Sequence, residues 1–273
     1  MRIIVTLIAV LAGALNVQAQ RVGFAYWNVD RLCDTLRSPF YDDADYTPGG
    51  RLRWTAERYR KKVNDVAAVM DSMAMPVTVL FGVENEAVAR DIAEACTCDY
   101  SYLHRTLDSS DGLDFALFYF GDALQPLRAV VVGRCVRIDC RIAGRRSVLL
   151  LSRSGRDAAA EALRVRRDDP ESTLIVMGRT YPEQLVEAGV ADTFAAEERA
   201  GRGTVVYRGV WSFDGRICAD TMLRTRAAVY ARRRLFNRSG TAPAPTYVRG
   251  RYAGGVSRSL PVFVTAEWPD AER

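Results

Sequence analysis

Several polar side chains follow stretches of apolar residues, where a buried strand would end, and these groups are the ones that could do chemistry. The clearest is Glu84, which comes shortly after the apolar run Val77–Phe81. Asn28 and Asp30 follow a first apolar run, and Asp114 lies within another. Catalytic groups in mixed α/β folds tend to lie just beyond the ends of buried strands. The Glu84 carboxylate could therefore hold a metal ion for catalysis.

Two arginines stand at comparable places later in the chain. Arg179 follows the apolar run Ser172–Met177, and Arg258 lies just before the last apolar run, Leu260–Val264. A guanidinium group recognises phosphate through paired hydrogen bonds.

The hydrophobic pattern predicts the elements that must position these groups. Strands are predicted over residues 21–29, 77–81, 113–120, 172–177, 204–210, 216–218 and 260–264, with a hairpin formed by 129–140 and 147–151. Helices are predicted over residues 54–73, 86–95, 157–166 and 181–188. This order indicates mixed sheets with helices outside, in one domain from about residue 20 to the C-terminus.

The first residues predict export. Met1-Arg2 is followed by an apolar run over Ile3–Leu15 and then by Val17-Gln18-Ala19, which has the form of a cleavage site. Residues 1–19 are therefore interpreted as a signal peptide, cut after Ala19, which places the mature protein outside the cell or in the periplasm. The apolar run is too short to span a bilayer, and no other membrane span is expected.

The chain contains 6 cysteines, and an exported protein can form disulfides. Cys135 and Cys140 are close enough in sequence to bridge across a hairpin. Buried free thiols, or one such bridge, are favoured over a metal cluster because the chain has 1 histidine and no Cys-x-x-Cys pair.

The formal net charge is +5, and 36 of the 38 basic residues are arginine, because only Lys61 and Lys62 are lysine. Between Asp220 and Glu267 there is no acidic residue, yet there are nine arginines. Such a segment could face a polyanion or a phosphate, although a solvated basic face is the favoured account.

The ordered set of motifs resembles the secreted bacterial branch of the endonuclease/exonuclease/phosphatase family. The matching segments are Trp27–Asp30, Trp54-Thr55, Gly82–Asn85, Gly112–Leu117, Ser152-Arg153, Gly203-Thr204 and Tyr252–Gly255. They occur in the expected order over nearly all of the mature chain. The resemblance implies an α+β fold of the DNase I-like type, a four-layer sandwich in which two mixed β-sheets lie face to face with helices outside.

The resemblance also implies metal-assisted hydrolysis of phosphate esters, with a glutamate that binds Mg²⁺ and a histidine paired with an aspartate. Asn28, Glu84, Asp114 and Asp214 occupy positions of this family site and are the candidate catalytic residues. Glu84 is the metal ligand, if any metal binds.

The sequence departs from the family at other positions of the site. The family's Gly-Asp-x-Asn is here Gly178–Tyr181, which puts Arg179 in place of a carboxylate. The family's terminal Ser-Asp-His is Ser257–Ser259, and a further family histidine falls at about Leu149. The one histidine, His104, is expected to have a structural role or to lie at the rim of the site.

These losses predict a catalytically impaired protein without a resident metal, and Mg²⁺ would be the cofactor only of an active protein. Two like charges close to a cation oppose its binding. We therefore expect Glu84 to pair with Arg179 or Arg258, leaving a positively charged hollow for a phosphate-containing or polyanionic ligand.

Two alternatives stay open. One is an active metal-dependent phosphodiesterase or nuclease with a rearranged site, whose carboxylates would be Asp111, Asp114, Asp139 and Asp214. The other is a protein-interaction module that uses the arginine-rich C-terminal segment. The sequence does not decide whether nucleic acid is a partner.

Overall fold

The structure is a computed structural model that describes residues 21–269. The predicted signal peptide, residues 1–19, lies outside the described residues. Among the helices of the described part, none is both long and apolar enough to cross a membrane.

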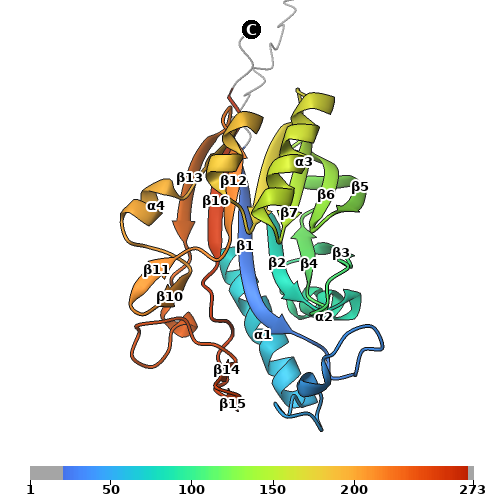
Figure 1. Cartoon of the computed structure of the whole chain (residues 1–273), viewed down its shortest axis with the longest axis vertical. Coiled ribbons are helices and arrows are strands. Elements are labelled where there is room, and N and C mark those ends of the chain that lie inside the picture. Colours follow the sequence, from blue (N-terminus) through green and yellow to red (C-terminus); the bar gives the residue numbers. More distant parts are fainter. Residues whose placement is uncertain (1–20, 270–273) are drawn as a thin grey trace, which may run out of the picture.

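Two six-stranded mixed sheets form the centre of the molecule (Figure 1). The first sheet has the order β13 (Arg224–Val229), β16 (Val262–Glu267), β1 (Arg21–Leu32), β2 (Val77–Val83), β4 (Asp114–Tyr119) and β3 (Ser101–Arg105). The second has the order β5 (Leu124–Val132), β6 (Cys135–Ile142), β7 (Arg145–Ser152), β8 (Thr173–Gly178), β12 (Arg216–Asp220) and β9 (Val190–Asp192). Two small hairpins are β10 (Val205–Tyr207) with β11 (Val210–Ser212), and β14 (Tyr247–Val248) with β15 (Arg251–Tyr252).

Helices cover the outer faces of the sheets. The α-helices are α1 (Ala56–Met73), α2 (Glu86–Ala95), α3 (Gly155–Asp168) and α4 (Ala195–Arg199). Short 3₁₀ turns are η1 (Ala44–Tyr46), η2 (Pro182–Gln184), η3 (Val186–Ala188) and η4 (Arg233–Leu235). Buried apolar residues form one core between the sheets, a second beneath α1 and α2, and a third beneath α3. The predicted four-layer sandwich is therefore the observed fold.

The central strands are apolar on both faces because each face meets another layer. Along β1, Phe24 and Tyr26 belong to the core between the sheets, whereas Ala25 and Trp27 belong to the core beneath the helices. Alternate side chains of a strand point to opposite faces, so a strand buried on both sides reads as a continuous apolar run.

Most predicted elements are present, with shifted ends. Helix α2 has the predicted bounds, and α1 begins at Ala56, where the Thr55 hydroxyl accepts a hydrogen bond from the Arg58 N–H. The predicted hairpin of 129–140 and 147–151 is observed as β6 and β7. Its first strand begins later than predicted, because Gly133 turns the chain with a φ of 56° and separates β5 from β6. The predicted helix over 181–188 is two 3₁₀ turns, and β3 and β13 were not predicted.

The cysteines are free thiols throughout the described part of the chain. The bridge considered between Cys135 and Cys140 is not formed, because both residues lie on β6. They are five positions apart, so their side chains point to opposite faces. Cys135 packs beneath α3, and Cys140 lies between the two sheets.

The candidate site forms where the parallel neighbours β1 and β2 end at the same edge of the first sheet. Their register shifts between Asn28 and Leu32, and Asp30 there has a φ of 65°. Gly82, with a φ of 93°, lies against this bulge, and a Cβ at this position would come within 1.9 Å of the Asp30 carbonyl oxygen. A glycine is therefore required two residues before Glu84.

Candidate functional site

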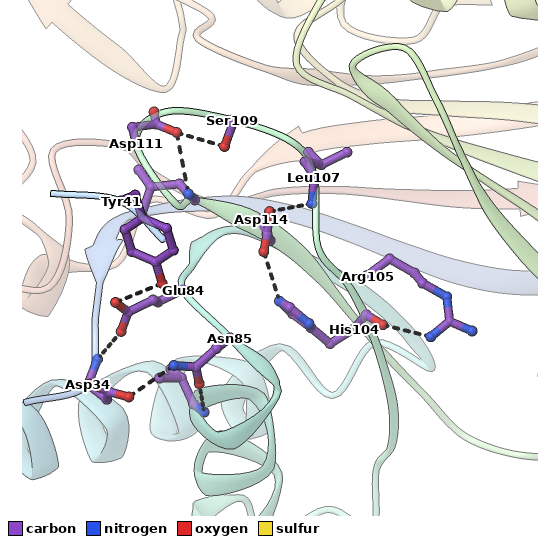
Figure 2. A network of polar contacts seen from close by, with 12 residues as sticks. Asp34, Tyr41, Glu84, Asn85, His104, Arg105, Leu107, Ser109, Asp111 and Asp114 are labelled. Atoms are coloured by element: carbon purple, nitrogen blue, oxygen red, sulfur yellow. Dashed lines mark hydrogen bonds and ion pairs between the residues drawn. The ribbon is translucent and has the colours of Figure 1, made fainter. Parts of the chain in front are cut away.

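Glu84 is buried at the end of β2, and both of its carboxylate oxygens accept hydrogen bonds (Figure 2). The Asp34 N–H donates to Oε2 at 2.6 Å, and the Tyr41 hydroxyl donates to Oε1 at 3.0 Å. The predicted ion pair with Arg179 or Arg258 is wrong: in residues 21–269, Glu84 has no arginine partner. The segment 33–43 covers the carboxylate instead.

Burial raises the pKa of Glu84 to about 7. The negative charges of Asp34 and Asp43 add to this rise, whereas the hydrogen bonds from the Asp34 N–H and the Tyr41 hydroxyl lower the pKa. The desolvation of the carboxylate outweighs these donors. Glu84 is thus a poorer cation ligand at neutral pH than an exposed glutamate.

Tyr41 is held between Glu84 and the loop that precedes β4. Its ring lies so close to Gly112 that a Cβ on this glycine would approach the ring to 2.3 Å. Figure 2 shows the ring next to the Glu84 carboxylate, to which the hydroxyl points. The segment is anchored nearby, since Asn85 donates from Nδ2 to Asp34 Oδ2 at 2.9 Å.

Asp214 is the centre of a second hydrogen-bond network. Asn28 Nδ2 donates to its Oδ2 at 2.9 Å. The hydroxyls of Thr204 and Ser259 donate to Oδ1 at 2.9 and 2.8 Å. Ser259 stands where the resemblance places the family's terminal histidine, so this position keeps a hydrogen bond to the aspartate and lacks a group that titrates near neutral pH.

Arg258 has its own carboxylate partner at the bulge of β1. Its Nε lies 3.1 Å from Asp30 Oδ2, and its side chain remains 66% exposed. The arginine that replaces a family carboxylate is therefore paired with Asp30 at the rim and does not reach Glu84.

Asp114 lies apart from these groups, in contact with His104 (Figure 2). Both side chains are buried, with 3.4 Å between His104 Nε2 and Asp114 Oδ2. The other carboxylate oxygen of Asp114 accepts the Leu107 N–H at 2.8 Å. Asp114 thus fastens the loop after β3 to β4, and the buried His104 Nε2 has no hydrogen-bond partner within the described residues.

A polar pocket of about 390 Å³ opens beside Asn28 and Asp214. Its lining residues are Tyr26, Asn28, Phe81, Asp108, Ser109, Ser110, Asp111, Arg134, Ser152, Arg153, Arg179 and Asp214. Glu84 and Arg258 are not among them. The structure thus separates the candidate residues, with Asn28, Asp214 and Arg179 in the pocket, Glu84 beneath Tyr41, and Asp114 with His104.

Two of the three arginines in the pocket are already paired. Arg153 forms two hydrogen bonds with the Asp111 carboxylate, at 2.9 and 2.7 Å, and lies 5.0 Å from the centre of the Phe81 ring. Arg134 lies 3.3 Å from Asp157. Both guanidinium groups therefore have their positive charge partly neutralised by a neighbour.

Arg179 is the guanidinium group available to a ligand. It follows Gly178, whose φ of 113° lets the chain turn close to Ser152, and the Arg179 N–H donates to the Ser152 carbonyl at 2.8 Å. The side chain is exposed and has no ion-pair partner in the part of the chain that the structure describes. Arg179 and Asp214 also line an adjoining pocket of about 240 Å³ that includes Tyr181.

The predicted positively charged hollow is wrong as a statement about net charge. The pocket wall contains three arginines, and it also contains three aspartates, Asp108, Asp111 and Asp214. The positive charge is local, and it is concentrated at Arg179.

The side chains present do not fit a resident magnesium ion, which prefers several oxygen ligands in a near-octahedral arrangement. Within residues 21–269, no three His, Cys, Asp or Glu side chains are grouped to hold a metal ion. Both oxygens of Glu84 accept hydrogen bonds, Asp214 accepts three, and Asp30 pairs with Arg258.

Sequence reasoning did not identify Tyr41 as a site residue. The segment 38–50 is polar and rich in proline and glycine, so it reads as a connecting loop. Its function as a cover depends on contacts with residues more than 40 positions away, and the local pattern contains no sign of these. Arg134 was missed for the same reason, because it lies in the turn between β5 and β6.

Comparison with known proteins agrees with the observed fold. The sequence profile described as "Endonuclease/Exonuclease/phosphatase family" matches residues 23–154. No curated protein has a significantly similar sequence. A solved structure of an endonuclease/exonuclease/phosphatase family protein from Bacteroides thetaiotaomicron has 13% identity and a TM-score of 0.61, and the match covers 92% of this chain and 96% of that one.

Two further solved structures share the fold. The mannosyl-6-phosphatase of B. thetaiotaomicron has 13% identity and a TM-score of 0.58, with 90% of this chain and 100% of that chain covered. TDP2 of D. rerio, solved with a single-strand DNA product, has 12% identity and a TM-score of 0.57, with 90% and 99% covered. At these identities the likeness establishes the fold alone. Residues 23–154 thus match the endonuclease/exonuclease/phosphatase family, and the described chain has the fold of the solved members of that family.

Proposed function

We propose that this protein is a catalytically impaired member of its family that binds a phosphate-containing ligand in the pocket beside Arg179. The proposal depends above all on one observation. The carboxylate that would hold the catalytic cation, Glu84, is buried and accepts hydrogen bonds from Asp34 and Tyr41.

The chemistry of the family explains why this arrangement impairs catalysis. Hydrolysis of a phosphate ester needs positive charge to stabilise the phosphoryl oxygens, and it needs a positioned group that activates water. Here Ser259 stands in place of the family's histidine and donates to Asp214. Arg179 and Arg258 stand in place of two carboxylates. An arginine remains protonated at neutral pH, so it cannot act as the base.

The same replacements favour binding of an anion. The exposed Arg179 guanidinium can donate two hydrogen bonds to one phosphate group, and the neighbouring Ser110 hydroxyl can donate a further one, whereas the Ser109 hydroxyl already donates to Asp111 Oδ1. The three aspartates of the wall would repel a highly charged polyanion. The pocket therefore favours a single phosphate group over a long stretch of nucleic-acid backbone.

A rearranged active site built from aspartates is less well supported. Asp111 is bound to Arg153, Asp114 to the Leu107 N–H, and Asp139 to Arg137 on β6. Asp214 accepts its three hydrogen bonds from Asn28, Thr204 and Ser259. Each carboxylate already has a structural partner that a cation would have to displace.

We also propose that the protein is exported. The support is the sequence of residues 1–19, with its positive start, apolar run and small residues at the cleavage position. Detection of the mature protein, beginning after Ala19, in the periplasmic or culture fraction would support export. Retention of residues 1–19 in cytoplasmic protein would contradict it.

The impairment is tested by hydrolysis assays on the purified protein with Mg²⁺ or Mn²⁺. Mannose 6-phosphate and a short single-stranded DNA are suitable substrates, because solved neighbours are described with a sugar phosphatase activity and with a DNA product. We expect no turnover above that of a Glu84→Ala variant. Turnover that this variant abolishes would overturn the proposal.

Ligand binding is tested separately, by calorimetry with inorganic phosphate and mannose 6-phosphate. We expect Arg179→Ala to weaken binding about tenfold, which corresponds to one lost charge-assisted contact. Arg224→Ala is the matched control, since it removes an exposed arginine outside the pocket. Equal affinity in the wild-type protein and Arg179→Ala would exclude Arg179 as the anion site.

A further inference from the structure

A separate pocket lies between the end of α1 and the segment that follows β13. Its volume is about 350 Å³, within the range of small-molecule sites. The lining residues are Ser72, Met73, Met75, Val229, Tyr230, Ala231, Arg232 and Phe263. None of them lines the pocket beside Arg179.

One end of this pocket is polar and cationic. The Ser72 and Tyr230 hydroxyls are 2.5 Å apart, and the Arg232 guanidinium lies 5.3 Å from the centre of the Tyr230 ring. Arg234 is held nearby, because its Nη2 donates to the Ala68 carbonyl of α1 at 2.8 Å. The pocket wall thus contains two hydroxyls and the Arg232 guanidinium, and Arg234 lies outside the lining but close enough to the Tyr230 hydroxyl to act on it.

The local electrostatics favour a negative charge at this end. Burial would raise the pKa of Tyr230, but the Ser72 hydroxyl, Arg232 and Arg234 together lower it below its ordinary value. Groups that stabilise a phenolate would stabilise another anion in the same place. The nearest acidic residue in sequence, Asp71, accepts hydrogen bonds from the Thr97 and Cys98 N–H groups and is not in the lining.

Arg232 and Arg234 have no acidic residue near them in the sequence. The sequence has no acidic residue between Asp220 and Glu267. In the part of the chain that the structure describes, Arg232 and Arg234 form no ion pair with a protein carboxylate. Their positive charge is therefore available to a ligand.

The other end of the pocket is apolar. Met73, Met75, Val229 and Phe263 form its wall, and all four belong to or pack against the core beneath α1. Methionine side chains adapt to irregular apolar groups because they are unbranched and polarizable. This wall suits a short aliphatic chain that extends away from the arginines.

We propose that this pocket binds an aliphatic carboxylate, with its head group at Arg232, next to Arg234, and its apolar tail along Met73, Met75 and Phe263. A planar carboxylate matches the fork of a guanidinium group. The tail contributes affinity through the apolar surface that it removes from water. This site is independent of the phosphate pocket proposed above.

The test is a titration of the purified protein with octanoate, followed by ligand-observed NMR, beside titrations with acetate and octan-1-ol. We expect saturable binding of octanoate, and at least tenfold weaker binding of acetate, which lacks the tail, and of octan-1-ol, which lacks the charge. The Arg232→Ala/Arg234→Ala double variant should bind octanoate about tenfold more weakly, and Arg224→Ala should bind it as the wild-type protein does.

A blocking variant covers the case in which the double variant does not fold. Ala231 is exposed and lines the pocket, so Ala231→Trp should fill it without disturbing the core and should abolish octanoate binding. Absence of saturable octanoate binding to the wild-type protein at millimolar concentrations would overturn the proposal. Unchanged octanoate binding by Ala231→Trp, or acetate binding as tight as that of octanoate, would also overturn it.

Discussion

At the scale of single residues, the contacts of Glu84 decide how the site is interpreted. A glutamate at this position of the family is expected to face a cation, but here it faces a backbone N–H and a phenol. Each hydrogen bond satisfies one oxygen of a side chain that is 3% exposed. Tyr41 therefore stabilises a buried carboxylate that would otherwise be costly to the fold.

Replacing Tyr41 by phenylalanine tests whether its hydroxyl stabilises the buried Glu84 carboxylate. The Tyr41→Phe variant keeps the ring against Gly112 but removes the donor to Glu84 Oε1. We expect the free energy of unfolding to fall by about 1–3 kcal/mol, the usual effect of leaving a buried acceptor unpaired. Urea denaturation measures it, with the exposed Tyr207→Phe as a control that should change little. Equal stability of Tyr41→Phe and wild type would show that the hydroxyl does not stabilise Glu84.

The raised pKa of Glu84 makes a prediction about pH. Its pKa is about 7 in the folded protein and near 4.5 in the unfolded chain, so folding takes up a proton between these values. Stability from this group is therefore complete below about pH 4.5 and is lost as the pH rises through 7.

The change should amount to at most about 3.5 kcal/mol, the product of the pKa difference and about 1.4 kcal/mol per unit. Denaturation at pH 5 and pH 8 should show a larger loss of stability in the wild-type protein than in Glu84→Gln, which cannot titrate. Glu94→Gln, an exposed change on α2, is the control and should keep the wild-type dependence. The same pH dependence in Glu84→Gln would contradict the raised pKa.

At the scale of elements, the bulge of β1 and the end of β2 form one unit. The carbonyl of Asp30 approaches Gly82 so closely that no side chain fits on residue 82. The Asp30 carboxylate also forms an ion pair with Arg258. The parallel pairing of β1 and β2 then places Asn28 and Glu84 at one edge of the sheet, while the segment 33–43 returns over Glu84.

Substitution of Gly82 tests this unit. Gly82→Ala would bring a Cβ within 1.9 Å of the Asp30 carbonyl oxygen and would strain a backbone with a φ of 93°. We expect a loss of at least about 3 kcal/mol, beyond the usual cost of one strained φ. Gly144→Ala is the matched control, because its φ is also positive and nothing lies within 4 Å of the added Cβ. Denaturation curves that place both variants at similar stability would contradict the close approach.

The position of the cysteines on β6 gives a second test at this scale. Because Cys135 and Cys140 face opposite sides of the sheet, we expect no bridge between them in protein purified without reductant. Alkylation before and after unfolding, read by mass spectrometry, should label Cys96 and Cys98 first and the other four only after unfolding. A peptide pair linked through Cys135 and Cys140 would contradict the observed register.

At the scale of the whole molecule, the fold and the site depend on different parts of the sequence. The three cores are built from apolar side chains at strand and helix spacing, and such periodic patterns can be recognised without the structure. Mixed sheets with helices outside, the helix α2 and the buried strand before Glu84 could therefore be predicted from the pattern. The four-layer sandwich was predicted from the resemblance to the family.

The arrangement of the site could not be predicted in the same way. Whether Glu84 meets Arg179, Arg258 or Tyr41 depends on how a loop without periodic pattern folds back over the sheet edge. Strand β13 was also not predicted. It lies at the edge of its sheet, and Arg224 and Arg226 interrupt the apolar pattern that marks a buried strand. A single sequence identifies which residues could take part in a site, but it does not show which of them contact one another when they lie far apart in the chain.

The central claim is that Glu84 is a buried, hydrogen-bonded residue and not a metal ligand. Electron paramagnetic resonance of Mn²⁺ during titration of the wild-type protein and of Glu84→Ala tests it most directly. We expect no saturable Mn²⁺ binding that depends on Glu84 at millimolar metal. Saturable binding to the wild-type protein that disappears in Glu84→Ala would contradict the claim.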